Sequence, residues 1–103
     1  MVILPAVLAL LLAQETPPLL TPDQWVRQPS LEYPERAQAR DVRRGFVVLD
    51  CRFEQAVVTD CTVVEETPAG FGFGASALRA VRRGVAAEGV EGHRTIRLDF
   101  VLG

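Results

Sequence analysis

Two cysteines ten positions apart, each inside a run of alternating apolar residues, constrain the fold of this 103-residue chain more than any other feature. Side chains of an extended strand alternate between its two faces, so one face of the first run would carry Val47, Leu49, Cys51 and Phe53. The second run would place Thr59, Cys61 and Val63 together in the same way. The stretch 45–66 is therefore predicted to form two strands of a hairpin.

If the chain reverses near residues 55–57, Cys51 lies opposite Cys61 in an antiparallel pair. The same register puts Leu49 opposite Val63 and Phe53 opposite Thr59. Cysteines directly opposite one another come within bridging distance, particularly at a non-hydrogen-bonded position. We predict a cross-strand Cys51–Cys61 disulfide. The turn lacks the Gly, Pro, Asn or Asp of short hairpin turns, so a loop of three to five residues is expected.

The first thirteen residues indicate export. Residues 2–13 are apolar and uncharged, and the run is too short to span a bilayer as an anchored helix. It fits the core of a signal peptide, although no Lys or Arg precedes it. Residues 1–13 are interpreted as a signal peptide or short hydrophobic leader, with an uncleaved anchor or a truncated gene start as alternatives. A paired set of cysteines agrees with an oxidising compartment. The expected location is periplasmic, or associated with the inner membrane if the leader is retained.

Residues 14–30 form a proline-rich segment, with four prolines in seventeen residues. Such a segment cannot sustain a helix or a central strand, and it is predicted to be extended. Residues 21–25 could form one short helical turn. Trp25 is then expected to dock on the domain that follows, as a residue that covers apolar surface rather than as a binding residue.

The remaining residues, 31–103, are expected to be one domain. Pro34 suits the start of a short helix, which continues to about Arg40. A second helix is predicted from about Gly74 to Ala87, with an arginine-rich outer side. The last run alternates apolar and polar residues over 95–102, as a half-buried strand does. The prediction is an α+β fold in which two helices pack on one face of a three-stranded antiparallel sheet, in the order helix-strand-strand-helix-strand.

Alternating aromatics and glycines in residues 70–74 lack the Lys-Ser/Thr of a phosphate-binding loop. Phe71 and Phe73 are better explained as core anchors.

No catalytic or cofactor chemistry is indicated. All eleven basic residues are arginines interspersed with thirteen acidic residues, which does not resemble a nucleic-acid-binding surface. His93 has no partner at metal-ligand spacing, and neither serine lies in a nucleophile motif. The cysteines lie mid-strand and apart, unlike a reactive Cys-X-X-Cys pair, so a structural bridge is favoured over a redox couple. We expect a non-enzyme without metal or cofactor.

Several motifs resemble the TonB C-terminal domain family. These are Tyr-Pro-Glu-Arg-Ala at 33–37, the valine-rich hairpin, the connection at 64–74 and Ala-Leu-Arg-Ala at 77–80. The resemblance covers residues 31–103, and the cysteine pair is similar to that of a subset of the family. It implies a periplasmic protein-protein interaction module that pairs an extended segment, such as part of an outer-membrane receptor, with its free sheet edge. It also implies a link to energy-dependent outer-membrane transport.

The matching edge in this sequence is the last strand. Its main-chain groups would carry the affinity, over the residues Thr95, Ile96, Arg97, Leu98, Asp99, Phe100 and Val101. The alternative is a self-associating structural envelope module with no transport role, in which this strand pairs with a second copy to form a homodimer. In both cases membrane association would come only through partners, unless the leader is retained.

Overall fold

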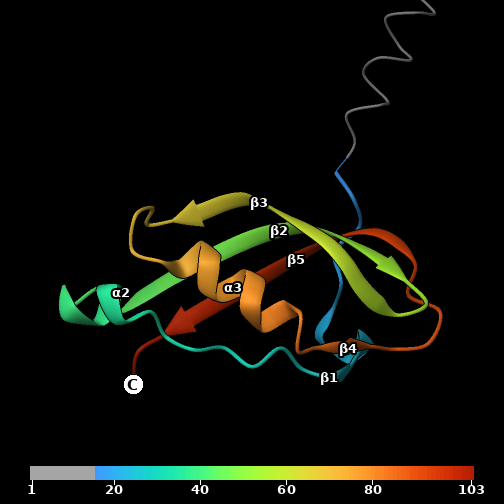
Figure 1. Ribbon diagram of the computed structural model, residues 1–103, viewed down its shortest axis with the longest axis horizontal. Coiled ribbons are helices and arrows are strands. Elements are labelled where there is room, and N and C mark those ends of the chain that lie inside the picture. The colour runs from blue at the N-terminus through green and yellow to red at the C-terminus, as the bar shows by residue number, and fades with distance from the viewer. Residues whose placement is uncertain (1–15) are drawn as a thin grey trace, which may run out of the picture.

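The computed structural model describes residues 16–103 and has the α+β fold that the sequence predicts (Figure 1). A three-stranded antiparallel sheet has the strand order β3-β2-β5, and a small second sheet pairs β1 with β4. The predicted leader, residues 1–13, lies outside the described residues. The elements are the 3-10 helix η1 (Pro22–Gln24), β1 (Trp25–Arg27), α2 (Glu35–Ala39), β2 (Arg44–Glu54), β3 (Val57–Thr67), α3 (Phe73–Val81), β4 (Val85–Ala86) and β5 (Gly92–Val101).

The β2–β3 hairpin has the predicted register at its centre, with Cys51 opposite Cys61 and Leu49 opposite Val63. The register shifts at two places, because Val64 and Thr59 are extra residues of β3 with no partner on β2. Phe53 consequently lies opposite Val58, so the predicted Phe53–Thr59 pairing was wrong. A bulge of this kind bends and twists a strand locally. A uniform period of two could not show where the bulges would fall.

The hairpin turn is shorter than predicted. Only Gln55 and Ala56 connect Glu54 to Val57, with φ angles of 52° and 65°. Positive φ at both central residues matches the twist of two-residue hairpin turns, although neither residue is one that favours it. Contacts from outside the hairpin hold the turn. The Gln55 N–H donates to Glu91 Oε2 at 2.6 Å, and the Ala56 N–H donates to the Val90 carbonyl at 3.1 Å.

Replacing Ala56 with glycine should stabilise the fold. The left-handed conformation costs an L-residue about 1–2 kcal/mol, and the greater entropy of glycine in the unfolded chain offsets part of the gain. We expect the free energy of unfolding to rise by about 0.5–1 kcal/mol in urea denaturation. Ala39→Gly is the matched control, because exposed Ala39 is in helix α2 and its replacement should lower stability. Destabilisation by both variants would contradict this account of the turn.

Helix α3 ends at Val81, six residues before the predicted Ala87. Residues 85–86 instead form β4, which pairs with β1 through Trp25↔Ala86 and Arg27↔Val85. Gly84 lies between the end of α3 and the start of β4, and a Cβ built there would be 2.7 Å from the Trp25 ring. The close approach of this ring therefore requires glycine where the chain leaves the helix. Val85 lies at helical spacing from Leu78 and Val81, which is why the sequence predicted a longer helix.

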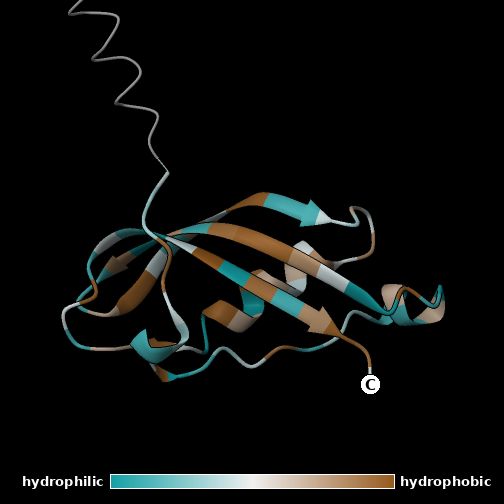
Figure 2. Ribbon diagram, turned by 180° about the vertical axis from the view of Figure 1, so that it is seen from behind, coloured by the Kyte–Doolittle hydropathy of each residue, from teal (hydrophilic) through white to brown (hydrophobic). Residues whose placement is uncertain are grey.

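The core lies between the sheet and α3, which crosses one face of it (Figure 1). In β5, inward-facing apolar side chains alternate with mostly polar outward ones, and Figure 2 shows this as alternating brown and teal bands, whereas β2 is apolar on both faces over residues 46–49. Among the expected core anchors, Phe73 is fully buried and Phe71 is half-buried. The short helix α2 lies past the end of the sheet and buries Ala37.

The proline-rich segment packs on this domain through η1, the predicted short turn, and through β1. Trp25 is half-buried, and its ring meets the buried Phe53 ring edge-on with centroids 6.1 Å apart. This confirms that Trp25 covers apolar surface. Leu20 is also buried, so part of the proline-rich segment, residues 14–30, is integrated with the domain. Its described part, residues 16–30, is called the leader below.

Candidate protein-binding edge

The three-stranded sheet has two outer strands, and they differ in regularity. Strand β5 pairs with β2 without interruption from Arg44↔Val101 to Phe53↔Gly92. Strand β3 carries the two bulges at Thr59 and Val64. Bulges break the regular row of N–H and C=O groups that another strand needs, and natural proteins use them to protect edges. Of the two edges, β5 offers the better template for an added strand.

The hydrogen bonds of β5 show which main-chain groups face outward. Thr95 donates its N–H to the Pro18 carbonyl at 2.9 Å and accepts from the Leu20 N–H at 2.8 Å. At the other end, the Leu102 N–H donates to the Arg43 carbonyl at 2.9 Å, on the side of β2. Because N–H and C=O of one residue point to the same side and successive residues alternate, odd-numbered residues of β5 face away from β2.

The predicted edge residues therefore fall into three groups. Even-numbered residues direct their main chain to β2 and bury their side chains; these are Ile96, Leu98 and Phe100. Thr95 faces outward but is bonded to the chain's own leader in a short parallel bridge. The outward groups of Arg97, Asp99 and Val101 take part in none of the main-chain bonds that the described residues form outside helices and strands. The edge open to a partner thus runs from Arg97 to Val101.

The leader's place beside Thr95 was not predicted. Three bonds hold it, since Thr95 Oγ1 also donates to the Pro17 carbonyl at 2.7 Å. A proline-rich segment has no strand periodicity from which this pairing could be read. The pairing sets one end of the open edge.

Two charged side chains on the outer face of β5, Arg97 and Asp99, form an ion pair with each other. Arg97 Nη2 lies 3.1 Å from Asp99 Oδ1, and the Arg97 guanidinium carbon lies 4.0 Å from the centre of the Phe46 ring. An exposed ion pair contributes little to stability in water, so it can be rearranged at small cost. Arg44, opposite Val101 on β2, is exposed and forms no ion pair among the described residues.

A groove of about 490 Å³ opens on the outer face at this end of the sheet. It joins the end of β3, the start of β2 and the end of β5. Its lining residues are Arg44, Gly45, Phe46, Thr67, Pro68, Arg97, Asp99, Phe100 and Val101. The groove therefore lies directly beside the open edge.

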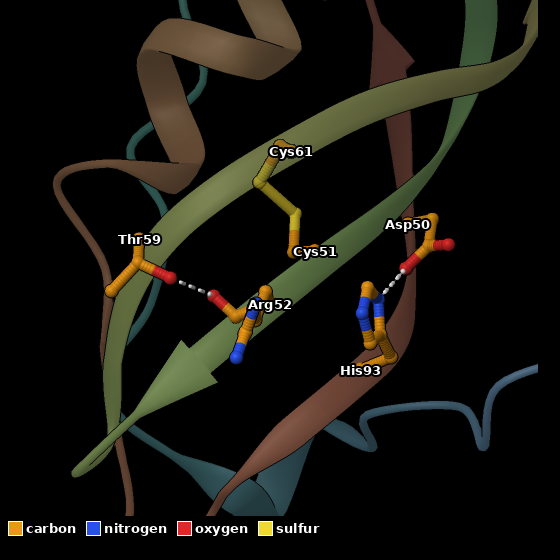
Figure 3. Close-up of a disulfide and its surroundings, with 6 residues drawn as sticks. All are labelled: Asp50, Cys51, Arg52, Thr59, Cys61 and His93. Atoms are coloured by element: carbon orange, nitrogen blue, oxygen red, sulfur yellow. Dashed lines mark hydrogen bonds and ion pairs between the residues drawn. A yellow bond between two sulfur atoms is a disulfide. The ribbon is translucent and has the colours of Figure 1, made fainter.

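The predicted disulfide is present between Cys51 and Cys61, with their Cα atoms 4.1 Å apart (Figure 3). Cys51 is fully buried, and the bridge lies on the helix side of the sheet. His93 lies within β5, and its Nδ1 is 3.0 Å from Asp50 Oδ1. This exposed pair is a surface contact.

Residues 16–103 contain no group of three or more His, Cys, Asp or Glu side chains placed to hold a metal ion. Within the same residues, no helix has the length and apolar character needed to cross a membrane. Comparisons with protein-family models and with curated proteins find no match for this chain. The resemblance to the TonB C-terminal domain family therefore stays a prediction from the sequence.

Proposed function

We propose that this protein is a non-enzymatic interaction module that binds an extended segment of a partner protein by strand addition at β5. The observation that carries the proposal is the row of outward main-chain groups at Arg97, Asp99 and Val101 on an uninterrupted strand. Each of these residues offers one N–H and one C=O to a new strand. Main-chain bonding of this kind gives affinity, and neighbouring hollows give specificity.

The proposed setting is the periplasm, as the TonB-like motifs imply. The partner would be an extended segment of an envelope protein, such as an outer-membrane receptor, and the binding would serve energy-dependent transport. The Cys51–Cys61 bridge of the hairpin supports an oxidising compartment only weakly. The binding mechanism itself depends only on the open edge and not on the location.

Proline at position 99 tests the mechanism. The Asp99 N–H faces the open edge, so Asp99→Pro removes a donor to the partner while the β2–β5 bonds of Leu98 and Phe100 remain. We expect Asp99→Pro to abolish capture of the partner from an envelope extract while the variant stays folded by circular dichroism. In the complex with the unaltered protein, the amides of Arg97 and Asp99 should become protected from hydrogen exchange.

Two controls make this test specific. Asp99→Thr removes the carboxylate and keeps the N–H, so it should still capture the partner. Glu66→Pro removes an N–H that faces the outer edge of β3, because Glu66 lies opposite Val47, whose own main-chain groups face Leu98 of β5. It should also leave capture unchanged. Equal capture by Asp99→Pro and the unaltered protein would rule out strand addition at β5.

A second candidate is self-association, in which two β5 edges pair about a two-fold axis. It is favoured by the same open edge and by Val101, the last residue of β5, which is 67% exposed. Sedimentation over a range of concentrations separates the two candidates. A dimer that is lost in Asp99→Pro supports self-association, whereas a monomer at every concentration excludes it.

A further inference from the structure

Two hollows lie beside the open edge of β5, on the side of the sheet that carries the leader. The first, of about 240 Å³, lies between the leader and the middle of β5. Its apolar lining includes Leu19, Leu20 and Pro29, together with Leu98. Leu98 has the largest exposed fraction, 9%, of the buried apolar side chains among the described residues. Part of the Leu98 side chain, at the edge of the core, is therefore exposed in the first hollow.

The second hollow, of about 280 Å³, lies nearer the end of β5. It is bounded by Leu31 and Tyr33 on one side and by Phe100 on the other. Tyr33 is held there by a hydrogen bond from its hydroxyl to the Val42 carbonyl and by edge-on packing against Phe73. This wall is therefore fixed by the fold, and Leu31 adds a 38% exposed side chain to it.

The spacing of the hollows matches the repeat of a β-strand. They adjoin Leu98 and Phe100, which are successive inward-facing residues of β5. A strand added to the open edge would place its own inward-facing side chains opposite these two, about 6.7 Å apart. Side chains at two positions separated by one residue would then enter the two hollows.

The charge of Arg44, on the outer face of the sheet, predicts a third feature of the partner segment. Arg97 and Asp99 neutralise one another, whereas Arg44 at the end of the edge has no ionic partner among the described residues. Arg44 lines the outer-face groove opposite Val101. A partner side chain that faces outward beside Val101 would lie on the same side as Arg44, where a carboxylate is favoured.

We propose that the occupant of this edge is an extended peptide segment with apolar side chains at two positions separated by one residue and a carboxylate next to them, toward Arg44. This inference rests on the proposed strand addition and names the chemistry of its partner. The leader and the segment that follows it supply the outer walls of both hollows. The N-terminal segment of this chain therefore sets the side-chain specificity of an edge that main-chain bonds alone would leave unselective.

Synthetic eight-residue peptides test the proposal with the full chain. The first peptide has two valines separated by one threonine in a serine-threonine host, with an aspartate directly before the first valine. The second peptide has the aspartate directly after the second valine instead. The comparison peptides have the two valines adjacent, or replaced by threonine. We expect one of the aspartate orders to bind about tenfold more tightly than both comparison peptides, because each valine buries apolar surface.

Variants of the walls locate the effect. Leu19→Ser and Leu31→Ser should each weaken binding of the preferred peptide about three- to tenfold, the loss expected for one apolar contact. Val26→Ser is the matched control, because Val26 is 74% exposed and lines neither hollow. It should leave the affinity unchanged. Arg44→Ser should remove the preference for the aspartate peptide over the same peptide with asparagine.

Amide hydrogen exchange at Arg97 and Asp99 separates this inference from the proposed function. If all four peptides protect these amides with equal affinity, strand addition stands and the side-chain preference is overturned. If no peptide protects them at millimolar concentration, both the preference and the strand addition are overturned. Protection that follows the affinity order of the peptides, and that Leu19→Ser and Leu31→Ser weaken, supports both.

Discussion

Replacing Phe73 with alanine should lower the free energy of unfolding by about 3–5 kcal/mol, the cost of removing a buried aromatic ring from a packed core. Phe73 is fully buried at the start of α3. Its ring centre lies 5.5 Å from that of Tyr33 and 5.1 Å from that of Phe100. A single ring therefore joins the helix, the last strand and the segment before α2.

The backbone of β2 at Gly45 packs directly against the Phe73 ring. A Cβ built on Gly45 would lie 2.8 Å from two carbons of the Phe73 ring. The strand is thus in contact with the ring face through its main chain, and alanine at position 73 would leave a cavity that β2 cannot fill. A loss of this size is a large part of the roughly 5–15 kcal/mol that stabilises a typical domain.

Urea denaturation followed by tryptophan fluorescence measures the effect. Phe71→Ala is the control, because Phe71 is half-buried and its replacement should cost clearly less. Phe73→Leu keeps most of the volume and should fold with an intermediate loss, which preserves the test if the alanine variant does not fold. Equal losses for Phe71→Ala and Phe73→Ala would show that the ring at position 73 does not have this central role.

The hairpin of the main sheet and its buried face could be predicted from the sequence because they follow from the alternation of side chains along a strand. Val47 and Leu49 are buried as their positions in the run require, and the register that joins Cys51 to Cys61 follows from one assumed reversal point. Local features decided by distant contacts could not be predicted. The tight turn at Gln55 is held by Glu91, which is 36 residues away in the chain.

The same distinction applies to the candidate site. The family resemblance implies that the last strand is an edge strand, as β5 is, but a period of two cannot say which edge of a sheet stays regular. That depends on the bulges of β3, such as the one at Val64, and on the bonds between the leader and Thr95. The end of α3 was misplaced for a similar reason, since Gly84 is contacted by the ring of Trp25, about sixty residues earlier in the chain.

Removing the disulfide is expected to have the second largest effect on stability. The bridge closes a loop across ten positions of the chain, for which the chain-entropy account gives about 2–3 kcal/mol. The double variant Cys51→Ala/Cys61→Ala should therefore melt about 10–20 °C below the unaltered protein, given the usual change in melting temperature per kcal/mol for a small domain.

Reduction of the unaltered protein is the comparison, because it opens the bridge and keeps both sulfur atoms in place. It should lower the melting temperature by nearly as much as the double variant, since Cys51 remains packed in the core. If the reduced and oxidised proteins have the same melting temperature, the bridge contributes nothing to stability. The fold would then not depend on an oxidising compartment.

Loss of the bridge should affect the two outer strands of the sheet, β3 and β5, differently. The bridge joins β2 to β3, so its loss should loosen the bulged strand first, while β5 is bonded to β2 along its whole length. Amide hydrogen exchange on the reduced protein should accordingly show faster exchange in β3 at residues paired with β2, such as Asp60 and Thr62, than at Leu98 in β5. Equal acceleration in both strands would mean that the sheet opens as one unit, and that the binding edge depends on the disulfide as strongly as the hairpin does.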